Sequence, residues 1–213
     1  MKKTGCIFVN GDLKDKKFYK DIIADCEIVV AADGAANSLK DLEIIPDIII
    51  GDMDSIDDQV YSYYENKNVA MLKYPVKKDK TDTELAIDEL EIRGYRDALM
   101  MGFAGGRIDH MLGNLGMCSY ADAVGIDLTL RDENTAIFLA QKGKTIIKAA
   151  KNSIISFISY AGSVYIKKLT GFEYPLEDYI LMPGSTRCIS NAAVQDDPVL
   201  EIESGCALVI INF

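Results

Sequence analysis

The stretch Pro46-Asp-Ile-Ile-Ile-Gly-Asp-Met-Asp-Ser-Ile-Asp-Asp58 decides the fold of the first part of the chain. Ile48 to Ile50 form a short aliphatic run, which predicts a buried strand, and the run stops at Gly51. Asp52 and Asp54 follow at once and are separated by one residue, so an extended backbone would direct both carboxylates to the same side. A loop that leaves the end of a buried strand is a usual place for a site in an α/β protein.

Two interpretations fit this stretch by itself. Two carboxylates held together repel each other unless a cation lies between them, and such oxygen ligands suit Mg²⁺ with bound phosphates. Alternatively, the stretch is a polar turn in which Ser55 or Asp57 caps the next helix. A pair of aspartates with this spacing does not separate the two interpretations, so the rest of the chain has to decide.

Strand-like and helix-like segments alternate through the first part of the chain. Predicted strands cover residues 4–10, 27–32, 47–51, 69–74 and 98–102, and predicted helices cover 15–25, 35–42, a segment through Tyr61 and Tyr64, a segment after Thr81, and 107–120. This alternation predicts a parallel sheet with right-handed crossovers, in which all strand C-terminal ends share one edge. The polar residues that follow strand ends are therefore expected to converge: Asn10, Asp12, Asp33, Asp52, Asp54, Asp79, Asp82, Arg107 and Asp109.

Two helices carry specific signals. Thr81 and Glu84 form a capping-box pattern, which places Asp82 in the first helical turn. In the helix predicted over 107–120, one face is apolar and predicted to face the core: Ile108, Met111, Leu112 and Leu115. Another face is polar and includes the only histidine, which we expect to line a site: Arg107, His110 and Asn114.

The chain has a different pattern after about residue 125. Short strand-like runs are separated by turn signals and no helices: 126–131, 135–140, 145–149, 154–160, 164–169, 179–182, 187–193, 199–204 and 207–213. The sequence therefore predicts an α/β protein with two domains. An N-terminal parallel-sheet, Rossmann-like catalytic domain covers residues 1–140, and a C-terminal all-β sandwich domain covers residues 141–213.

Composition narrows the class of protein. The 213 residues are 49% hydrophobic and 26% charged, as in soluble globular proteins, and no apolar run reaches the length of a membrane span. The net charge of −10 argues against a nucleic-acid partner. The five cysteines are widely spaced without a Cys-x-x-Cys pair, which argues against a zinc site or a disulfide framework and indicates reduced thiols in the cytoplasm.

The predicted acidic edge allows a specific chemistry. Asp52, Asp54 and Asp82 are the expected Mg²⁺ ligands, and the planar guanidinium of Arg107 suits phosphate oxygens. Gly105-Gly106 would let the backbone approach a phosphate closely. The alternatives are a plain turn for the two glycines and a surface ion pair for Arg107. Neither a P-loop nor a G-x-G-x-x-G motif is present.

Five motifs together resemble those of thiamin pyrophosphokinases in order and spacing. They are Asp47-x-x-x-Gly51-Asp-Met-Asp-Ser-Ile56, Lys78-Asp-Lys-Thr-Asp-Thr-Glu-Leu-Ala86, Gly105-Gly-Arg-Ile-Asp-His-Met-Leu-Gly-Asn114, Gly171-Phe-Glu-Tyr-Pro-Leu176 and Gly184-Ser-Thr-Arg-Cys-Ile-Ser-Asn191. The resemblance implies that ATP and thiamin react to give AMP and thiamin diphosphate with Mg²⁺, the thiamin hydroxyl attacking the β-phosphorus. It also implies a homodimer with active sites shared between subunits.

The resemblance assigns roles position by position. Asp52, Asp54 and Asp82 match the metal carboxylates and, with Arg107 and Asp109, the catalytic set. The implied ATP and acceptor site includes Asp33, Asp79, Thr81, Gly106 and Asn114. In the second domain, Ser190 and Asn191 match positions that meet the aminopyrimidine of thiamin, and Tyr174 matches an aromatic that packs on that ring.

One departure and two alternatives stay open. The family often has Asp-Gly-Gly-Ala where this chain has Asp33-Gly-Ala-Ala36, and Ala35 would be strained if the backbone there needs a positive φ. One alternative keeps the reaction and changes the acceptor, for example to a hydroxymethylpterin, but Tyr174 and Ser190-Asn191 favour thiamin. A non-enzymatic sensor of thiamin or nucleotide is disfavoured, because a binder has little need of three converging aspartates.

Overall fold

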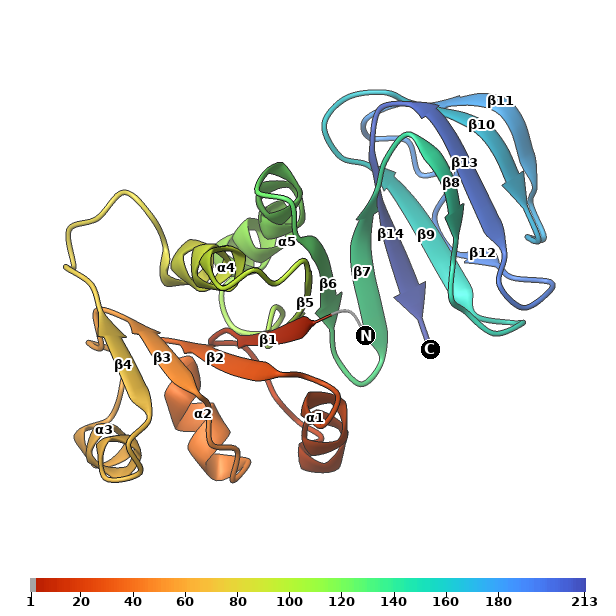
Figure 1. Ribbon diagram of the computed structural model, residues 1–213. Coiled ribbons are helices and arrows are strands. Elements are labelled where there is room, and N and C mark those ends of the chain that lie inside the picture. Colours follow the sequence, from red (N-terminus) through yellow and green to blue (C-terminus); the bar gives the residue numbers. More distant parts are fainter. Residues whose placement is uncertain (1–2) are drawn as a thin grey trace. The chain divides into compact units, whose positions relative to one another are not determined.

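The computed structural model describes residues 3–213, and the chain divides after Glu133 into two compact units (Figure 1). The sequence predicted a boundary at residue 140, whereas the division after Glu133 places the strand Thr135–Ala140 in the second unit. Within the described residues, no helix combines the length and the apolar character needed to cross a lipid bilayer.

The first unit alternates strands and helices, as predicted. Its elements are β1 (Thr4–Phe8), α1 (Lys16–Ile23), β2 (Ile28–Ala32), α2 (Ala35–Asp41), β3 (Ile48–Gly51), α3 (Asp58–Glu65), β4 (Ala70–Lys73), α4 (Asp82–Ile92), β5 (Asp97–Met101), α5 (Ile108–Ala123) and β6 (Asp127–Arg131). The strands are parallel in the order β6-β5-β1-β2-β3-β4, which confirms the predicted parallel sheet.

The order of the strands explains where the helices lie. From β1 to β4 the chain steps outward along the sheet, and the next strand, β5, returns to the other side of β1. Because crossovers are right-handed, the helices before and after this return cover opposite faces. Figure 1 shows α1, α2 and α3 on one face and α4 and α5 on the other. The core on the first face includes fully buried Phe8, Tyr19, Leu39, Ile49 and Tyr64.

Two predictions for the first unit were wrong. Cys6 and Cys26 form a disulfide, because β1 and the segment that leads into β2 lie side by side and bring the two Cα atoms to 6.1 Å. On α5, Ile108 and Leu112 are largely exposed, and the buried residues are Cys118 and Ala121 near the other end of the helix. The helical spacing identified an apolar face but not what covers it.

The second unit contains only strands. They are β7 (Thr135–Ala140), β8 (Gly143–Ile146), β9 (Ile154–Ser159), β10 (Val164–Thr170), β11 (Leu176–Leu181), β12 (Asn191–Ala192), β13 (Val199–Ser204) and β14 (Ala207–Asn212). Within this unit the orders are β12-β9-β14-β7 and β11-β10-β13-β8, and the pairings are antiparallel. One apolar core draws on both sets, and Phe157 and Phe172 meet edge to face in it at 5.4 Å.

Candidate active site

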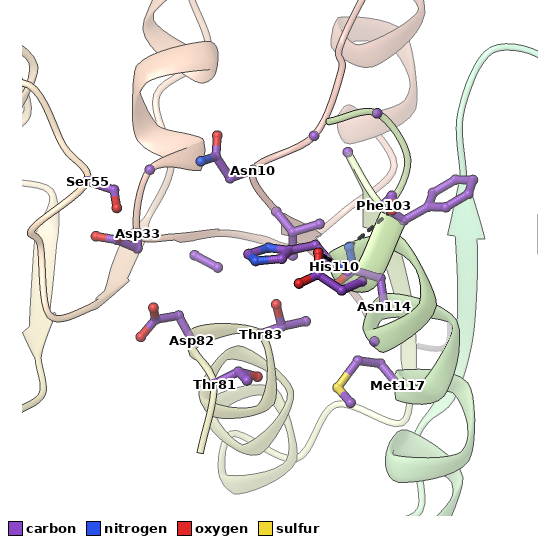
Figure 2. Close-up of a pocket in the computed structure, with 18 of the residues that line it drawn as sticks. Asn10, Asp33, Ser55, Thr81, Asp82, Thr83, Phe103, His110, Asn114 and Met117 are labelled. Carbon is purple, nitrogen blue, oxygen red and sulfur yellow. Dashed lines mark hydrogen bonds between the residues drawn. The ribbon is translucent and has the colours of Figure 1, made fainter. Parts of the chain in front are cut away.

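The loops after β1, β2, β3 and β5, with the first turns of α4 and α5, enclose a cavity of about 410 Å³ in the first unit. Because β1 lies between β5 and β2, the loops after β1 and β5 diverge here, which is the usual position of a crevice in an open α/β sheet. Figure 2 shows Asp33, Ser55 and Asp82 on one side of the cavity and His110 and Asn114 of α5 on the other. Most of the polar residues that were expected to converge at this edge of the sheet therefore line one cavity.

Three carboxylates form a cluster in the cavity. Asp33 follows β2, Asp52 follows β3, and Asp82 opens α4; each contributes one oxygen, and these oxygens lie within 4.8 Å of one another. Gly51 makes this approach possible, because a Cβ on its backbone (φ 150°) would lie 2.9 Å from Cβ of Asp33 and 3.0 Å from Oδ1 of Asp82. A larger residue at this position would push the carboxylates apart.

Asp33 gives the strongest indication of what the cluster binds. Its backbone is left-handed (φ 43°), and its N–H donates to the Ile50 carbonyl oxygen at 2.9 Å. Only 8% of the residue is exposed, and its Oδ1 has no hydrogen-bond partner among residues 3–213. A buried carboxylate oxygen without a partner is unfavourable, and a hard divalent cation satisfies it. The donor set therefore fits Mg²⁺.

Asp54, a predicted metal ligand, lies outside this cluster but lines the same cavity. Met53 between the two aspartates has φ 68°, so the backbone is not extended as the sequence suggested. The Asp54 N–H donates to Oδ1 of Asp52 at 3.3 Å, and its own Oδ1 accepts from Oγ of Ser55 at 3.0 Å. A role for Asp54 as a metal ligand stays a prediction.

Lys78 extends from the β4–α4 connection into the cluster. Its Nζ lies 3.1 Å from Oδ1 of Asp82 and 3.4 Å from Oδ2 of Asp52, and its side chain is 14% exposed. The contact with Asp52 has hydrogen-bond geometry, whereas the contact with Asp82 is an ion pair without that geometry. The sequence had indicated a group of lysines beside these aspartates without identifying which one points inward.

The cluster shifts the ionisation of its own members. Burial raises the pKa of the Asp82 carboxyl; Lys78 opposes this rise, and repulsion from Asp33 and Asp52 adds to it. Burial acts in the same direction on Asp52, but the Asp54 N–H and Lys78 outweigh it, so the pKa of Asp52 is lowered. Burial alone would lower the pKa of Lys78, but its two carboxylate partners raise it above its ordinary value.

The opposite wall comes from α5. Asp109, His110 and Asn114 line the cavity, and Nδ2 of Asn114 donates to the Phe103 carbonyl oxygen at 3.1 Å, which ties α5 to the loop after β5 (Figure 2). His110, which is expected to line a site, lines this cavity. Sequence reasoning had placed Asn114 at the site without this structural role.

Arg107 stands at the start of α5 but does not line the cavity. Its Nε donates to Oδ1 of Asp109 at 3.1 Å and its Nη2 donates to Oδ2 at 2.5 Å. This pair lowers the pKa of Asp109 and raises that of Arg107. To contact a phosphate, as predicted, Arg107 must either give up its hydrogen bonds to Asp109 or use N–H groups that Asp109 does not occupy.

The remaining predicted residues of the first unit divide between cavity and surface. Thr81 lines the cavity and caps α4: its hydroxyl accepts from the Glu84 N–H at 3.2 Å, and the Glu84 carboxylate accepts from the Thr81 N–H at 2.7 Å. The capping box is thus confirmed. Asp79 is exposed outside the cavity, and Gly106 (φ 65°) adjoins Gly105, which does line it.

Ala35, where the chain departs from the family pattern, is not strained. It is the first residue of α2 and fully buried, and the left-handed residue of this turn is Asp33. The positive φ that would disfavour alanine is absent at this position.

The second unit has its own cavity of about 260 Å³. It is lined by Glu173, Tyr174, Pro175, Leu176, Arg187, Cys188 and Asn191. Asn191 is 4% exposed, and its amide bonds the backbone of Tyr174 twice: Oδ1 accepts from the N–H at 3.1 Å and Nδ2 donates to the carbonyl oxygen at 2.9 Å. Asn191 therefore fixes the loop that presents Tyr174, whose side chain is largely exposed.

Ser190 does not line this second cavity. Its backbone is left-handed (φ 58°), and its N–H donates to Oγ of Ser156 at 2.9 Å. Its predicted contact with a ligand therefore stays a prediction.

Some residues of both sites were not identified from the sequence. In the first unit Thr83, Phe103 and Met117 also line the cavity, and Asn37 holds the loop after β3 through Ser55 and Asp57. In the second unit Arg187 lines the cavity. Phe103 follows a strand end and shares the signal that identified Asn10 and the aspartates, whereas Asn37 and Met117 lie within helices and have no such signal.

Both parts of the chain match known sequence families. Residues 19–130 match "Thiamin pyrophosphokinase, catalytic domain", and residues 144–209 match "Thiamin pyrophosphokinase, vitamin B1 binding domain". The chain is 32% identical over 182 residues to thiamine pyrophosphokinase of Bacillus subtilis (strain 168), covering 85% of each protein. It is 29% identical over 205 residues to thiamine pyrophosphokinase 1 of Oryza sativa subsp. japonica, covering 84% of this chain and 76% of that protein.

Solved structures give the same result. The crystal structure of thiamine pyrophosphokinase from Bacillus subtilis superposes with a TM-score of 0.86 at 30% identity and covers 99% of both chains. That of thiamin pyrophosphokinase from Geobacillus thermodenitrificans superposes with a TM-score of 0.82 at 26% identity, covering 99% of this chain and 97% of that one. Family matches over both units and similarity over nearly the whole length lead to one conclusion: the chain belongs to the thiamin pyrophosphokinase family.

Proposed function

We propose that this chain transfers the pyrophosphoryl group of ATP to the hydroxyl group of thiamin, giving thiamin diphosphate and AMP. The observation that carries the proposal is the cluster of Asp33, Asp52 and Asp82 inside the cavity of the first unit, in a chain that matches both domains of the family. Phosphoryl-type transfer depends mainly on positioning and charge neutralisation, which converging carboxylates provide through a bound cation.

Asp33, Asp52 and Asp82 are the side chains that would hold Mg²⁺, and Asp54 is a further candidate at the same cavity. When bound, Mg²⁺ neutralises negative charge on the phosphate oxygens. Thr81 supports the metal site indirectly, because its cap fixes the first turn of α4, where Asp82 lies.

Other residues of the first unit suit the polyphosphate. Gly105 lines the cavity and is left-handed (φ 96°), and a Cβ there would lie 2.5 Å from Cγ of Asp12, so only glycine fits where this loop packs against Asp12. The N-terminus of α5 attracts anions, and Arg107 stands at that position. We assign Asp109 and Asn114 to the same site because they line the cavity, and Asp79 and Gly106 on the resemblance alone.

Thiamin would bind through the second unit. Tyr174 presents an aromatic ring beside a cavity, which suits packing on the aminopyrimidine, and Asn191 fixes the loop from which it projects. Ser190 is assigned on the resemblance. The reacting hydroxyl oxygen forms its new bond to the β-phosphorus, the bond from that phosphorus to the oxygen bridging to the α-phosphorus breaks, and the hydroxyl loses its proton.

Further parts of the proposal concern architecture and location. A Rossmann-like first domain and a β-sandwich second domain are supported by the parallel strand order and by the single core of the two antiparallel strand sets. A homodimer with shared sites follows from the resemblance, and the exposed Ile108 and Leu112 on α5 offer apolar surface for such a contact. A cytoplasmic location stays a prediction, and the Cys6–Cys26 disulfide contradicts the all-reduced cysteines on which it partly rested.

The test is an assay of AMP release from Mg·ATP with and without thiamin, with the products identified by mass. We expect AMP and thiamin diphosphate to appear together only when thiamin, ATP and Mg²⁺ are all present. Asp52→Asn should abolish the reaction, whereas Asp122→Asn, which neutralises an exposed carboxylate on α5, should not. ADP with thiamin monophosphate would contradict attack at the β-phosphorus, and no turnover with tight thiamin binding would favour a sensor.

A further inference from the structure

Lys78 differs from the other lysines of its segment. Residues 74–81 connect β4 to α4, and Lys77 and Lys80 in this connection are exposed, whereas the Lys78 side chain turns inward and is only 14% exposed. Burying an ammonium group is unfavourable unless it is paired. The inward orientation is therefore explained by its two partners, Asp52 and Asp82.

The partners of Lys78 are two of the three carboxylates of the proposed metal site. Its Nζ is 3.4 Å from Oδ2 of Asp52 and 3.1 Å from Oδ1 of Asp82. The third member of the cluster, Asp33, is buried, and one of its oxygens has no hydrogen-bond partner within residues 3–213. Three carboxylates carry three negative charges, and one ammonium reduces the sum to two. The ammonium therefore takes up part of the negative charge that would otherwise attract a divalent cation.

We propose that Lys78 is a built-in counter-cation of the carboxylate cluster, which competes with the divalent cation for Asp52 and Asp82 and so weakens binding of that cation when no nucleotide is present. This inference rests on the proposed metal site and adds a residue that sets its affinity. Lys78 also stabilises the cluster when no metal is bound, because it offsets repulsion between the carboxylates. A cation that the protein alone holds weakly would arrive together with the polyphosphate of ATP.

The experiment measures Mn²⁺ binding without nucleotide, by the electron paramagnetic resonance signal of free Mn²⁺, for the full chain and three variants. Lys78→Met removes the charge and keeps most of the side-chain volume. Lys78→Arg restores a positive charge, and Lys77→Met removes the neighbouring exposed charge as the matched control. We expect Lys78→Met to bind Mn²⁺ about tenfold more tightly than the unmodified chain does. Lys78→Arg and Lys77→Met should bind Mn²⁺ with the affinity of the unmodified chain.

A second readout separates competition from a merely structural role. When a chelator removes all metal, Lys78→Met should unfold at a lower temperature than Lys77→Met. Added Mn²⁺ should raise the unfolding temperature of Lys78→Met by more than it raises that of the unmodified chain. If Lys78→Met does not fold, Lys78→Gln takes its place in both measurements. Unchanged or weaker Mn²⁺ binding in the uncharged variant would overturn the inference. The thiamin-dependent release of AMP by the unmodified chain tests the proposed function independently.

Discussion

Asp33 combines two unfavourable features at one residue. Its backbone is left-handed, which aspartate tolerates better than most residues, and its buried carboxylate has an oxygen without a hydrogen-bond partner within residues 3–213. Features of this kind persist where the surrounding structure holds them, and they gather at functional sites. The resemblance placed Asp33 in the nucleotide site, whereas its geometry favours the metal.

Asp33→Asn and Asp54→Asn distinguish these roles. Asparagine keeps the size of the side chain and tolerates the left-handed backbone, so Asp33→Asn should fold while weakening Mn²⁺ binding by about tenfold or more. Asp54 lies outside the cluster, so Asp54→Asn should weaken Mn²⁺ binding by less than about threefold. Electron paramagnetic resonance measures both affinities, with Asp122→Asn as the control. A large loss of Mn²⁺ affinity in Asp54→Asn, without such a loss in Asp33→Asn, would identify Asp54 as a metal ligand in place of Asp33.

The elements that carry the first site were largely predictable from local sequence. Short aliphatic runs such as Ile48–Ile50 are buried on both faces of a parallel sheet, so their ends locate the site edge without any knowledge of tertiary contacts. The capping box at Thr81 and Glu84 fixed the start of α4, and hence the position of Asp82, for the same local reason. In both cases the signal lies in residues that are near one another in the chain.

Features that depend on distant contacts were not predictable in the same way. The left-handed turns at Asp33 and Met53 decide which carboxylates lie close together. Neither aspartate nor methionine indicates a left-handed conformation in a sequence as strongly as glycine does. The Cys6–Cys26 disulfide depends on the pairing of β1 with β2 and has no signal in the cysteine spacing. The exposed position of Leu112 depends on which element packs against α5, which periodicity alone does not specify.

Thr81→Ala tests how far the site depends on the start of α4. Removing the hydroxyl leaves the Glu84 N–H without its capping acceptor, so we expect a loss of about 1 kcal/mol in the free energy of unfolding. In a chain of this size that loss lowers the unfolding temperature by about 2–4 °C. Circular dichroism during heating measures it. Thr81→Ser keeps the acceptor and should behave like the unmodified chain, and an equal loss in both variants would argue against capping as the cause.

At the scale of the whole molecule, the two proposed substrates use different units. The acidic cavity, with its carboxylate cluster and glycine-containing loops, lies entirely in the first unit. The cavity beside Tyr174 and Asn191 lies entirely in the second, which has its own apolar core. A change confined to one cavity should therefore affect one substrate more than the other, provided that the rest of the unit stays folded.

Tyr174→Ala provides this separation. Tyr174 is 63% exposed and is not part of the core, so removing its ring should leave the unfolding temperature nearly unchanged. If the ring packs on the aminopyrimidine, the KM for thiamin should rise about fivefold to tenfold, in line with the energy of an aromatic contact. The KM for ATP should stay constant, because no residue of the acidic cavity changes. Ile180→Ala, which removes an exposed apolar side chain from β11, is the control. A parallel rise in both KM values would mean that the variant disturbs the catalytic unit, and an unchanged KM for thiamin would remove Tyr174 from the thiamin site.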